Sequence, residues 1–249
     1  MSLFLHELKA EQRLYWRSRE AAFFTFIFPL LLYVLVSAFY TGRIEGEPAG
    51  RVLLAGLLGY AAATTTFAGI AIFLVVRREN GVLKRLRATP LPPPVYIAAL
   101  LGSTLLVFAL EAVAMIFLAR VAYDVAVPDR LGSLAFSLLL GAATFTALGI
   151  ALTAAIRSAE GASAVVNLIV LPMAFLSGAF GPTRHYPEVL RAIADVLPLT
   201  YLIRLVRGAI VFDRPFWHFP TAIGVLAAWG LVGLVLAVLY FRWEPTQAG

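Results

Sequence analysis

Six long apolar stretches dominate the chain, and short polar segments separate them. A helix needs about 20 predominantly apolar residues to cross the roughly 30 Å hydrocarbon core of a bilayer, and each stretch is long enough to do so. The pattern therefore predicts an all-α membrane protein that forms a single transmembrane domain over residues 1–249. The predicted transmembrane helices cover residues of about 21–40, 52–76, 95–119, 131–156, 162–180 and 219–241.

Residues 1–20 mix basic side chains with aliphatic and aromatic ones. They lack the order of a secretory leader, in which a basic start, an apolar stretch and a small-residue cleavage site follow one another. The pattern predicts an amphipathic helix that lies in the headgroup zone of the membrane. A solvated cytoplasmic tail is the alternative. The basic positions are Lys9, Arg13, Arg17 and Arg19, and the apolar ones include Leu5, Leu8, Leu14, Tyr15 and Trp16.

Lysine and arginine are concentrated in alternate connecting segments. If the N-terminus is inside, the inner segments hold eleven of them: four in residues 1–20, five in residues 77–94, then Arg157 and Arg242. The short outer loops hold four, namely Arg43, Arg51, Arg120 and Arg130. Because short basic loops stay in the cytoplasm, we expect both termini to be cytoplasmic and the chain to lie in the inner membrane of a prokaryote.

The segment between the fifth and sixth stretches departs from this charge rule. Residues 181–218 lie outside in the predicted topology, yet they carry five arginines. Apolar residues recur at helical spacing before and after Pro198, which predicts two short amphipathic helices. We interpret residues 183–211 as an external re-entrant helical hairpin that dips into the outer leaflet. The alternative is a seventh span at about 196–212, which would place Arg204 and Arg207 near the bilayer centre at a high energetic cost.

Composition excludes several classes of protein. Hydrophobic residues make up 61% of the chain and charged residues only 14%, which is too apolar for a water-soluble globule. The net charge of +6 is divided among loops, so it does not indicate a nucleic-acid groove. The chain contains no cysteine, which excludes disulfides, thiolate catalysis and iron–sulfur clusters.

Candidate catalytic groups are scarce. The sequence holds no zinc-protease, nucleophile-elbow or phosphate-loop motif, and its three histidines are far apart. We therefore expect no enzyme active site, no metal and no cofactor in this chain. Glu111 is the one acidic residue well inside a span, and Asn167 is a weaker polar case. Such a carboxyl group lines the bundle interior or a water-filled path by default, and a hydrogen-bonded structural role is the alternative.

The loop from 77 to 94 is the most informative segment. From Gly81 a short helix can run to about Ala88, with apolar and basic residues on opposite faces, and the prolines after it prevent its continuation. A rigid helix between two spans suits the transmission of force to a cytoplasmic partner. A basic anchor without a docking role is the alternative. The apolar face holds Val82, Leu83 and Leu86, and the basic face holds Lys84, Arg85 and Arg87.

Two strings in this chain resemble a known family. Glu79-x-Gly81-x-Leu83-x-x-Leu86-x-x-Thr89-Pro90-Leu91 is similar to the loop after the second span in type-2 ATP-binding-cassette (ABC) exporter permeases. The second string resembles that family's fifth span and external hairpin. It comprises Leu176-Ser177-Gly178-Ala179-Phe180-Gly181-Pro182, Pro187, Leu190, Leu197-Pro198-Leu199-Thr200-Tyr201 and Arg207-Gly208.

The resemblance implies a partner and an energy source. In this family the helix here placed at 78–90 couples the permease to a cytoplasmic ATPase that binds ATP and Mg²⁺. We therefore expect two ATPase subunits and a second permease subunit, preferably an identical chain. Many relatives have an acidic residue where Lys84 stands. The implied coupling residues are Glu79, Gly81, Leu83, Leu86, Thr89 and Pro90, and the implied hairpin residues are Gly178, Pro182, Pro198 and Tyr201.

The nearly uncharged spans favour an amphipathic or lipid-like cargo, such as a drug, an antibiotic or a lipid-linked molecule. As pathway residues we select Thr66, Phe67, Asn167 and Phe175. One alternative function is a gradient-driven carrier or channel, for which Glu111 is the only acidic candidate. A non-transporting membrane scaffold is another alternative. The sequence does not identify the cargo.

Overall fold

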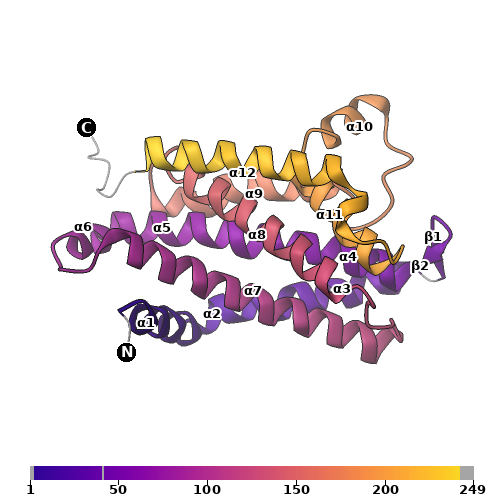
Figure 1. Ribbon diagram of the computed structural model, residues 1–249, viewed down its shortest axis with the longest axis horizontal. Coiled ribbons are helices and arrows are strands. Elements are labelled where there is room, and N and C mark those ends of the chain that lie inside the picture. Colours follow the sequence, from indigo (N-terminus) through magenta and orange to yellow (C-terminus); the bar gives the residue numbers. More distant parts are fainter. Residues whose placement is uncertain (1–2, 41, 242–249) are drawn as a thin grey trace.

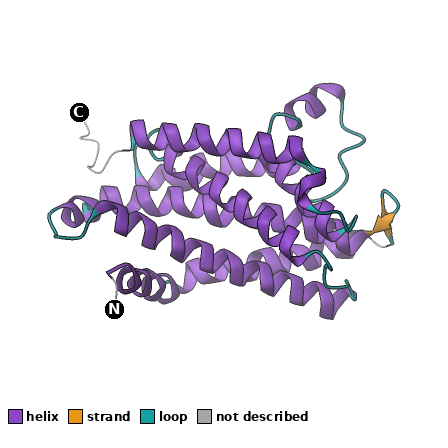
Figure 2. Ribbon diagram, in the orientation of Figure 1, coloured by secondary structure: helices purple, strands orange, loops and turns teal. Residues whose placement is uncertain are grey.

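The computed structural model describes residues 3–40 and 42–241, and these are mostly helical. The long helices run side by side along the longest axis of the molecule (Figure 1). The start of α1 (Leu3–Arg17), the short α6 (Val82–Arg87) and the end of α12 (Pro220–Tyr240) lie at one end of this bundle (Figure 1). A two-stranded hairpin, β1 (Arg43–Ile44) and β2 (Glu47–Pro48), lies at the opposite end (Figure 2).

Within the described residues, five helices are long and apolar enough to cross a membrane. The first of them, Ala49–Glu79, consists of α4 (Ala49–Ala62), η2 (Ala63–Gly69) and α5 (Ile70–Glu79). The other four are α7 (Pro93–Tyr123), α8 (Leu131–Leu152), α9 (Ala159–Leu176) and α12. The first predicted span corresponds to a shorter apolar helix, Phe23–Phe39. Arg242, which the sequence analysis counted as an inner charge, lies outside the described residues.

Two segments wind as π-helix inside these helices. The first is η1 (Phe23–Ile27), which joins α2 (Arg19–Ala22) to α3 (Phe28–Phe39). The second is η2, in which the Thr64 hydroxyl donates to the carbonyl oxygens of Tyr60 and Ala61 (3.0 and 3.1 Å). Such back-bonding competes with the regular helical ladder and bends helices. Because π-helical turns cluster at functional sites, both segments are candidate functional regions.

The α4 helix is the centre of the core and is buried along almost its whole length. The turn after α9 lies directly against it, because a Cβ at Gly56 would overlap the backbone of Ala179. The rings of Tyr60 and Phe180 meet edge to face beside this contact, with centroids 5.1 Å apart. A glycine at position 56 therefore allows the Ser-Gly-Ala-Phe-Gly turn to approach the helix backbone.

Small residues also join α8 to its neighbours. A Cβ at Gly233 of α12 would come within 2.8 Å of the Leu148 backbone, and a Cβ at Gly149 would come within 2.6 Å of the Phe67 carbonyl. The Thr144 hydroxyl donates to the Leu226 carbonyl oxygen of α12 at 3.0 Å. Close backbone approach at small residues is the usual way in which helices associate in a membrane.

The segment between α9 and α12 forms two helices, α10 (Glu188–Ala194) and α11 (Pro198–Ile210), followed by the short η3 (Phe216–His218). The α11 helix packs against α4, α8 and α12 and buries most of its residues. Its 13 residues are fewer than a bilayer crossing requires. The seventh-span alternative would place two arginines in lipid. In the structure, Arg204 instead contacts the carboxylate of Asp195, and Arg207 donates to the Gly178 carbonyl oxygen.

Candidate functional site

The α6 helix is fixed to the bundle by its apolar face. Gly81 adopts a left-handed conformation (φ 68°) at its start, which glycine accommodates without strain. Leu83 is fully buried in a cluster that also holds Ile70 and Leu74 of α5. Leu86 packs against the same cluster and is half-buried. The position of α6 is therefore set by α5 and α7, which supplies Tyr96 and Leu100 to the cluster.

The opposite face of α6 is open. Lys84 and Arg85 are exposed, and so are Thr89 and Pro90 in the turn that follows. The Thr89 hydroxyl accepts a bond from the Leu91 amide at 3.4 Å and donates to the Leu86 carbonyl oxygen at 2.7 Å. These bonds and the proline end the helix early, and residues 78 and 79 belong to α5, so α6 is shorter than the predicted 78–90. Of the predicted coupling residues, Glu79, Thr89 and Pro90 are exposed.

Glu79 belongs to α5 and not to α6. Its carboxylate accepts a hydrogen bond from the Ala159 amide at the beginning of α9. The Ser158 hydroxyl accepts from the Gly161 amide at 3.2 Å and caps the same helix. A carboxylate at a helix N-terminus is favoured by the free amides and by the helix dipole. Glu79 therefore joins the second predicted span to the fifth.

Arg78 joins the same helix to α8. Its guanidinium is buried and donates to the carbonyl oxygens of Thr153 (2.8 Å) and Ile156. These carbonyls belong to the turn in which α8 ends, where the last backbone acceptors of a helix need partners. A cation is also favoured there by the helix dipole.

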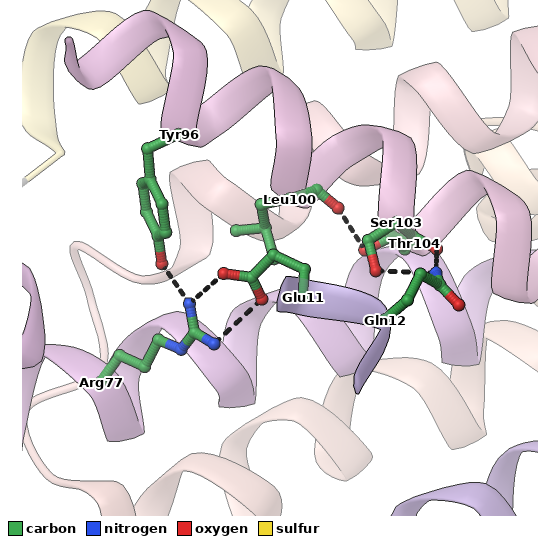
Figure 3. A network of polar contacts seen from close by, with 7 residues as sticks. All are labelled: Glu11, Gln12, Arg77, Tyr96, Leu100, Ser103 and Thr104. Carbon is green, nitrogen blue, oxygen red and sulfur yellow. Dashed lines mark hydrogen bonds and ion pairs between the residues drawn. The ribbon is translucent and has the colours of Figure 1, made fainter. Parts of the chain in front are cut away.

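Arg77 joins the helix to α1 and α7 (Figure 3). Its two terminal nitrogens donate to the two carboxylate oxygens of Glu11, at 2.7 and 2.9 Å. Nη1 also donates to the Tyr96 hydroxyl at 2.6 Å, and the guanidinium lies 3.9 Å from the centre of the Phe73 ring. The pair is almost completely buried, so bidentate geometry and the additional partners are needed to offset the loss of hydration.

A second contact holds α1 on α7. The Gln12 side-chain amide donates to the carbonyl and hydroxyl oxygens of Ser103, at 3.0 and 2.9 Å (Figure 3). The Trp16 indole donates to the Gln12 amide oxygen at 3.0 Å. Several other apolar side chains of α1, including Leu5 and Leu14, are exposed. The α1 helix therefore has one face fixed by polar contacts and another that is free to meet an apolar medium.

Arg77, Arg78 and Glu79 are consecutive, yet each binds a different part of the bundle. Together they connect the helix that leads into α6 with α1, α7, α8 and α9. We call these three residues the basal triplet. From the sequence, the two arginines are predicted only to be inner positive charges. The signal that could identify their role is the density of charge at the end of an apolar span, where side chains can reach several neighbouring helices.

The predicted pathway residues fall into two groups. Thr66 and Phe67 are buried inside the bundle, where the Thr66 hydroxyl donates to the Ala62 carbonyl oxygen and Phe67 packs on Phe145. Asn167 and Phe175 lie on the exposed face of α9, where Phe175 is 57% exposed. The chain by itself therefore does not enclose a path lined by all four.

The predicted hairpin residues lie around the turn that packs on α4. Gly178 is left-handed (φ 75°), and its carbonyl oxygen accepts a bond from Arg207 at 3.2 Å. Pro182 is half-buried in the same turn. Pro198 is buried in the first turn of α11, and the Tyr201 hydroxyl donates to the Asp195 carbonyl oxygen at 2.7 Å. Burial lowers the pKa of the Arg207 guanidinium.

Glu111 points into the bundle. The Thr65 hydroxyl donates to its Oε2 at 2.6 Å, whereas its Oε1 has no hydrogen-bond partner among the described residues. Within the same residues, no group of three or more histidine, aspartate or glutamate side chains is arranged to hold a metal ion.

Comparisons with known proteins agree with the resemblance of the two strings. Residues 2–211 match the family model described as ABC-2 type transporter. Inner membrane transport permease YhhJ of Escherichia coli (strain K12) is 22% identical over 170 residues, which cover 68% of this chain and 46% of YhhJ. Putative transport permease YvfS of Bacillus subtilis (strain 168) is 22% identical over 214 residues, which cover 84% of this chain and 85% of YvfS.

A third relative matches a shorter region. Nodulation protein J of Rhizobium meliloti (strain 1021) is 31% identical over 98 residues, which cover 39% of this chain and 37% of that protein. This chain thus spans less than half the length of YhhJ and of nodulation protein J in these alignments. The family model, by contrast, covers most of the chain, including α1, α6 and the turn at Gly178. The chain therefore belongs to the ABC-2 type transporter family.

Proposed function

We propose that this chain is the membrane-spanning permease subunit of an ABC exporter. Two copies form the membrane part, and two separate cytoplasmic ATPase subunits bind ATP and Mg²⁺. The apolar helix Phe23–Phe39 is the first of six transmembrane helices, and both termini lie in the cytoplasm with α6. The family membership and the transport permeases among the relatives support this assignment.

The observation that carries the proposal is the two-sided character of α6. Its apolar face is anchored by buried Leu83, while its basic face presents Lys84 and Arg85 at the end of the bundle. A loop that served only as a positive anchor would not need a buried apolar side chain. We assign the exposed face of α6, together with Thr89 and Pro90, as the surface that contacts the ATPase.

The basal triplet gives a physical route for the movement that follows. If ATP-driven closure of the ATPases displaces α6, then α5 moves with it because Leu83 is packed in a common cluster. Arg77 would then move α1, Arg78 the end of α8, and Glu79 the start of α9. Rigid elements joined by direct polar contacts transmit displacement better than a flexible loop.

The exposed surfaces support an amphipathic or lipid-like cargo. Leu168 and Phe175 on α9 are large, apolar and exposed. A pathway between two copies lined by such side chains would favour an apolar molecule with a small polar part over a sugar or an ion. We propose export from the cytoplasm or the inner leaflet as the direction.

Reconstitution with an ABC ATPase that co-purifies with the chain tests this proposal. The double variant Lys84→Glu/Arg85→Glu would lower the ATPase activity of the complex and its transport of a fluorescent amphiphile in vesicles. The double variant Arg184→Glu/Arg191→Glu, at exposed positions near α10, is the matched control and would leave both unchanged. Failure of any ATPase to co-purify, or equal activities in all three proteins, would overturn the assignment.

The carrier alternative rests on buried Glu111. If a gradient drives transport, cargo moves in vesicles without ATP, and Glu111→Gln abolishes that movement. The ABC proposal predicts no accumulation without ATP, whatever ion gradient is imposed.

A further inference from the structure

A cavity of about 430 Å³ lies between α1, η1, η2, α5 and α7. From η2 and α5 it is lined by residues between Thr64 and Val76, and from α7 by residues between Leu100 and Val107. These are the halves of the two long helices toward α6. The volume is in the range of small-molecule sites, which hold about 300–1,000 Å³. The cavity lies within one copy of the chain, so it differs from a pathway between two copies.

Both π-helical segments form walls of this cavity. Phe24 and Thr25 come from η1, and Thr64, Thr65 and Gly69 come from η2. The two segments are distant in the sequence but meet around the same space. π-Helical turns interrupt regular helix geometry and recur at functional sites. Their convergence here therefore indicates a ligand site, and this observation is independent of the cavity volume.

The polar groups in the wall are few and mostly engaged. Thr65 donates to Glu111, Ser103 accepts from Gln12, and Thr104 donates to the Leu100 carbonyl oxygen. The Tyr15 hydroxyl, by contrast, is buried and has no hydrogen-bond partner among the described residues. Thr25 lies near this hydroxyl without a well-formed bond. Burial raises the pKa of the Tyr15 phenol, which keeps it protonated and able to donate.

The carboxylate in the cavity wall is also already paired. Glu11 lines the cavity, but both its carboxylate oxygens are bound by Arg77. A charged ligand group would therefore find no opposite charge left to pair with it, and a buried unpaired charge is costly. An uncharged hydroxyl or carbonyl oxygen, by contrast, would satisfy the Tyr15 hydroxyl. The rest of the wall is apolar and would accept a hydrocarbon chain or ring.

We propose that this cavity binds one uncharged amphiphile, whose oxygen accepts a hydrogen bond from Tyr15 and whose apolar part lies between η1, η2 and α7. The ligand enters from the bilayer leaflet on the α6 side. Phe24 supports this route, because it contributes to the wall and is 65% exposed on the outer surface of the first apolar helix. The proposal concerns binding by the chain and does not depend on coupling to an ATPase.

Photolabelling of the purified full chain in lipid nanodiscs tests the site. The probe is a monoacylglycerol with a diazirine in its acyl chain, and mass spectrometry identifies the labelled peptides. We expect saturable labelling of α1, η2 and the first half of α7. A fatty acid and a lysophosphatidylcholine with the same diazirine chain test the preference for an uncharged head, and both should label these peptides at least several-fold less.

Two variants with a matched control test the position and the polar contact. Gly69 lines the cavity, and a Cβ there would meet only the Thr64 carbonyl at ordinary contact distance, so Gly69→Leu should fill the space and remove the labelling. Gly224→Leu introduces the same side chain at an open position of α12 and should leave labelling unchanged. Tyr15→Phe keeps the ring and should weaken binding of the monoacylglycerol about fivefold, the effect of one hydrogen bond.

Each outcome bears on the proposal. Unchanged labelling in Gly69→Leu, with a folded protein by size-exclusion chromatography, would overturn the site. Equal labelling by the charged probes would overturn the uncharged class of ligand. If Tyr15→Phe binds as tightly as the unchanged chain, the hydroxyl is not the recognition group. Because no ATPase is present, none of these results depends on the proposed transport function.

Discussion

The two ends of the bundle are held together by different chemistry. At the α6 end, charged side chains make the contacts: Arg77 with Glu11, Arg78 with the end of α8, and Glu79 with the start of α9. At the opposite end, the turn around Gly178 is held by a close backbone approach at Gly56 and by edge-to-face packing of Tyr60 on Phe180, with one hydrogen bond from Arg207 to the Gly178 carbonyl oxygen. Hydroxyl groups such as that of Thr200 complete this second set.

The difference indicates how each end responds to force. A buried charged contact fixes two elements at one distance and angle, because breaking it leaves an uncompensated charge. Separating packed rings or backbone atoms loses dispersion attraction but leaves no uncompensated charge. We therefore expect the α6 end to move as one connected unit, and the Gly178 end to be the place where helices shift relative to one another.

The largest expected effect is at the α6 end. Glu11→Gln removes the carboxylate charge and leaves Arg77 buried with Tyr96 and Phe73. We expect the free energy of unfolding to fall by about 3 kcal/mol, because one partner of a buried pair is left uncompensated. Equilibrium unfolding with SDS in mixed micelles measures the change.

Glu20→Gln is the control for this change, because Glu20 is an exposed glutamate near the same end. It should alter stability by no more than about 0.5 kcal/mol. Equal stability of Glu11→Gln and Glu20→Gln would show that the charged contacts do not hold α1, and the contrast between the two ends would be lost.

The second effect concerns the Gly178 end. Gly56→Ala places a methyl group against the Ala179 backbone, which must shift because backbone atoms cannot turn aside as a flexible side chain can. We expect a loss of about 2 kcal/mol in the same unfolding assay, as for an overpacked core. Gly132→Ala in α8 has open space around its Cβ and should be neutral or slightly stabilising. A neutral result for Gly56→Ala would mean that this contact is loose.

Much of this arrangement is predictable from the sequence, because short stretches of sequence determine it. The apolar stretches give the positions of the long helices, because length and composition suffice to define a membrane-compatible helix. The α6 helix is also predictable, because Gly81 and Pro90 bracket a short apolar and basic pattern. Its start follows left-handed Gly81 and its end is set by particular bonds of Thr89, which is why the helix is shorter than expected.

The contacts between distant residues are not predictable in the same way. Glu11 and Arg77 are 66 residues apart, and either could have been a solvated loop charge. Thr66 and Phe67 are buried in the bundle, and the sequence alone does not place them there, because a span that is apolar on every face has no periodicity to distinguish lipid from core. The cavity beside Tyr15 depends on how five elements meet, and no single stretch of sequence contains that information.

A third and smaller effect is expected at the hydroxyl contacts of the Gly178 end. The Thr200 hydroxyl donates to the Ala194 carbonyl oxygen at 2.6 Å and lies 3.0 Å from the Ser177 hydroxyl. Thr200→Val keeps the shape and removes the bond, so we expect a loss of about 1 kcal/mol. Thr221→Val, at an exposed position of α12, is the matched control and should not change stability. A loss as large as that of Glu11→Gln would contradict the ranking of the two ends.

The smallest effect on stability separates the two roles of the α6 end. Lys84 is exposed, so Lys84→Glu should change the free energy of unfolding by no more than about 0.5 kcal/mol. Leu83→Ala, one residue away, removes a fully buried side chain and should cost about 3 kcal/mol. If Lys84→Glu nevertheless weakens ATPase binding in a pull-down assay while the protein remains as stable as before, docking and anchoring reside on opposite faces of one short helix. A destabilisation by Lys84→Glu equal to that of Leu83→Ala would instead mean that the basic face is part of the fold, and its assignment as a docking surface would fail.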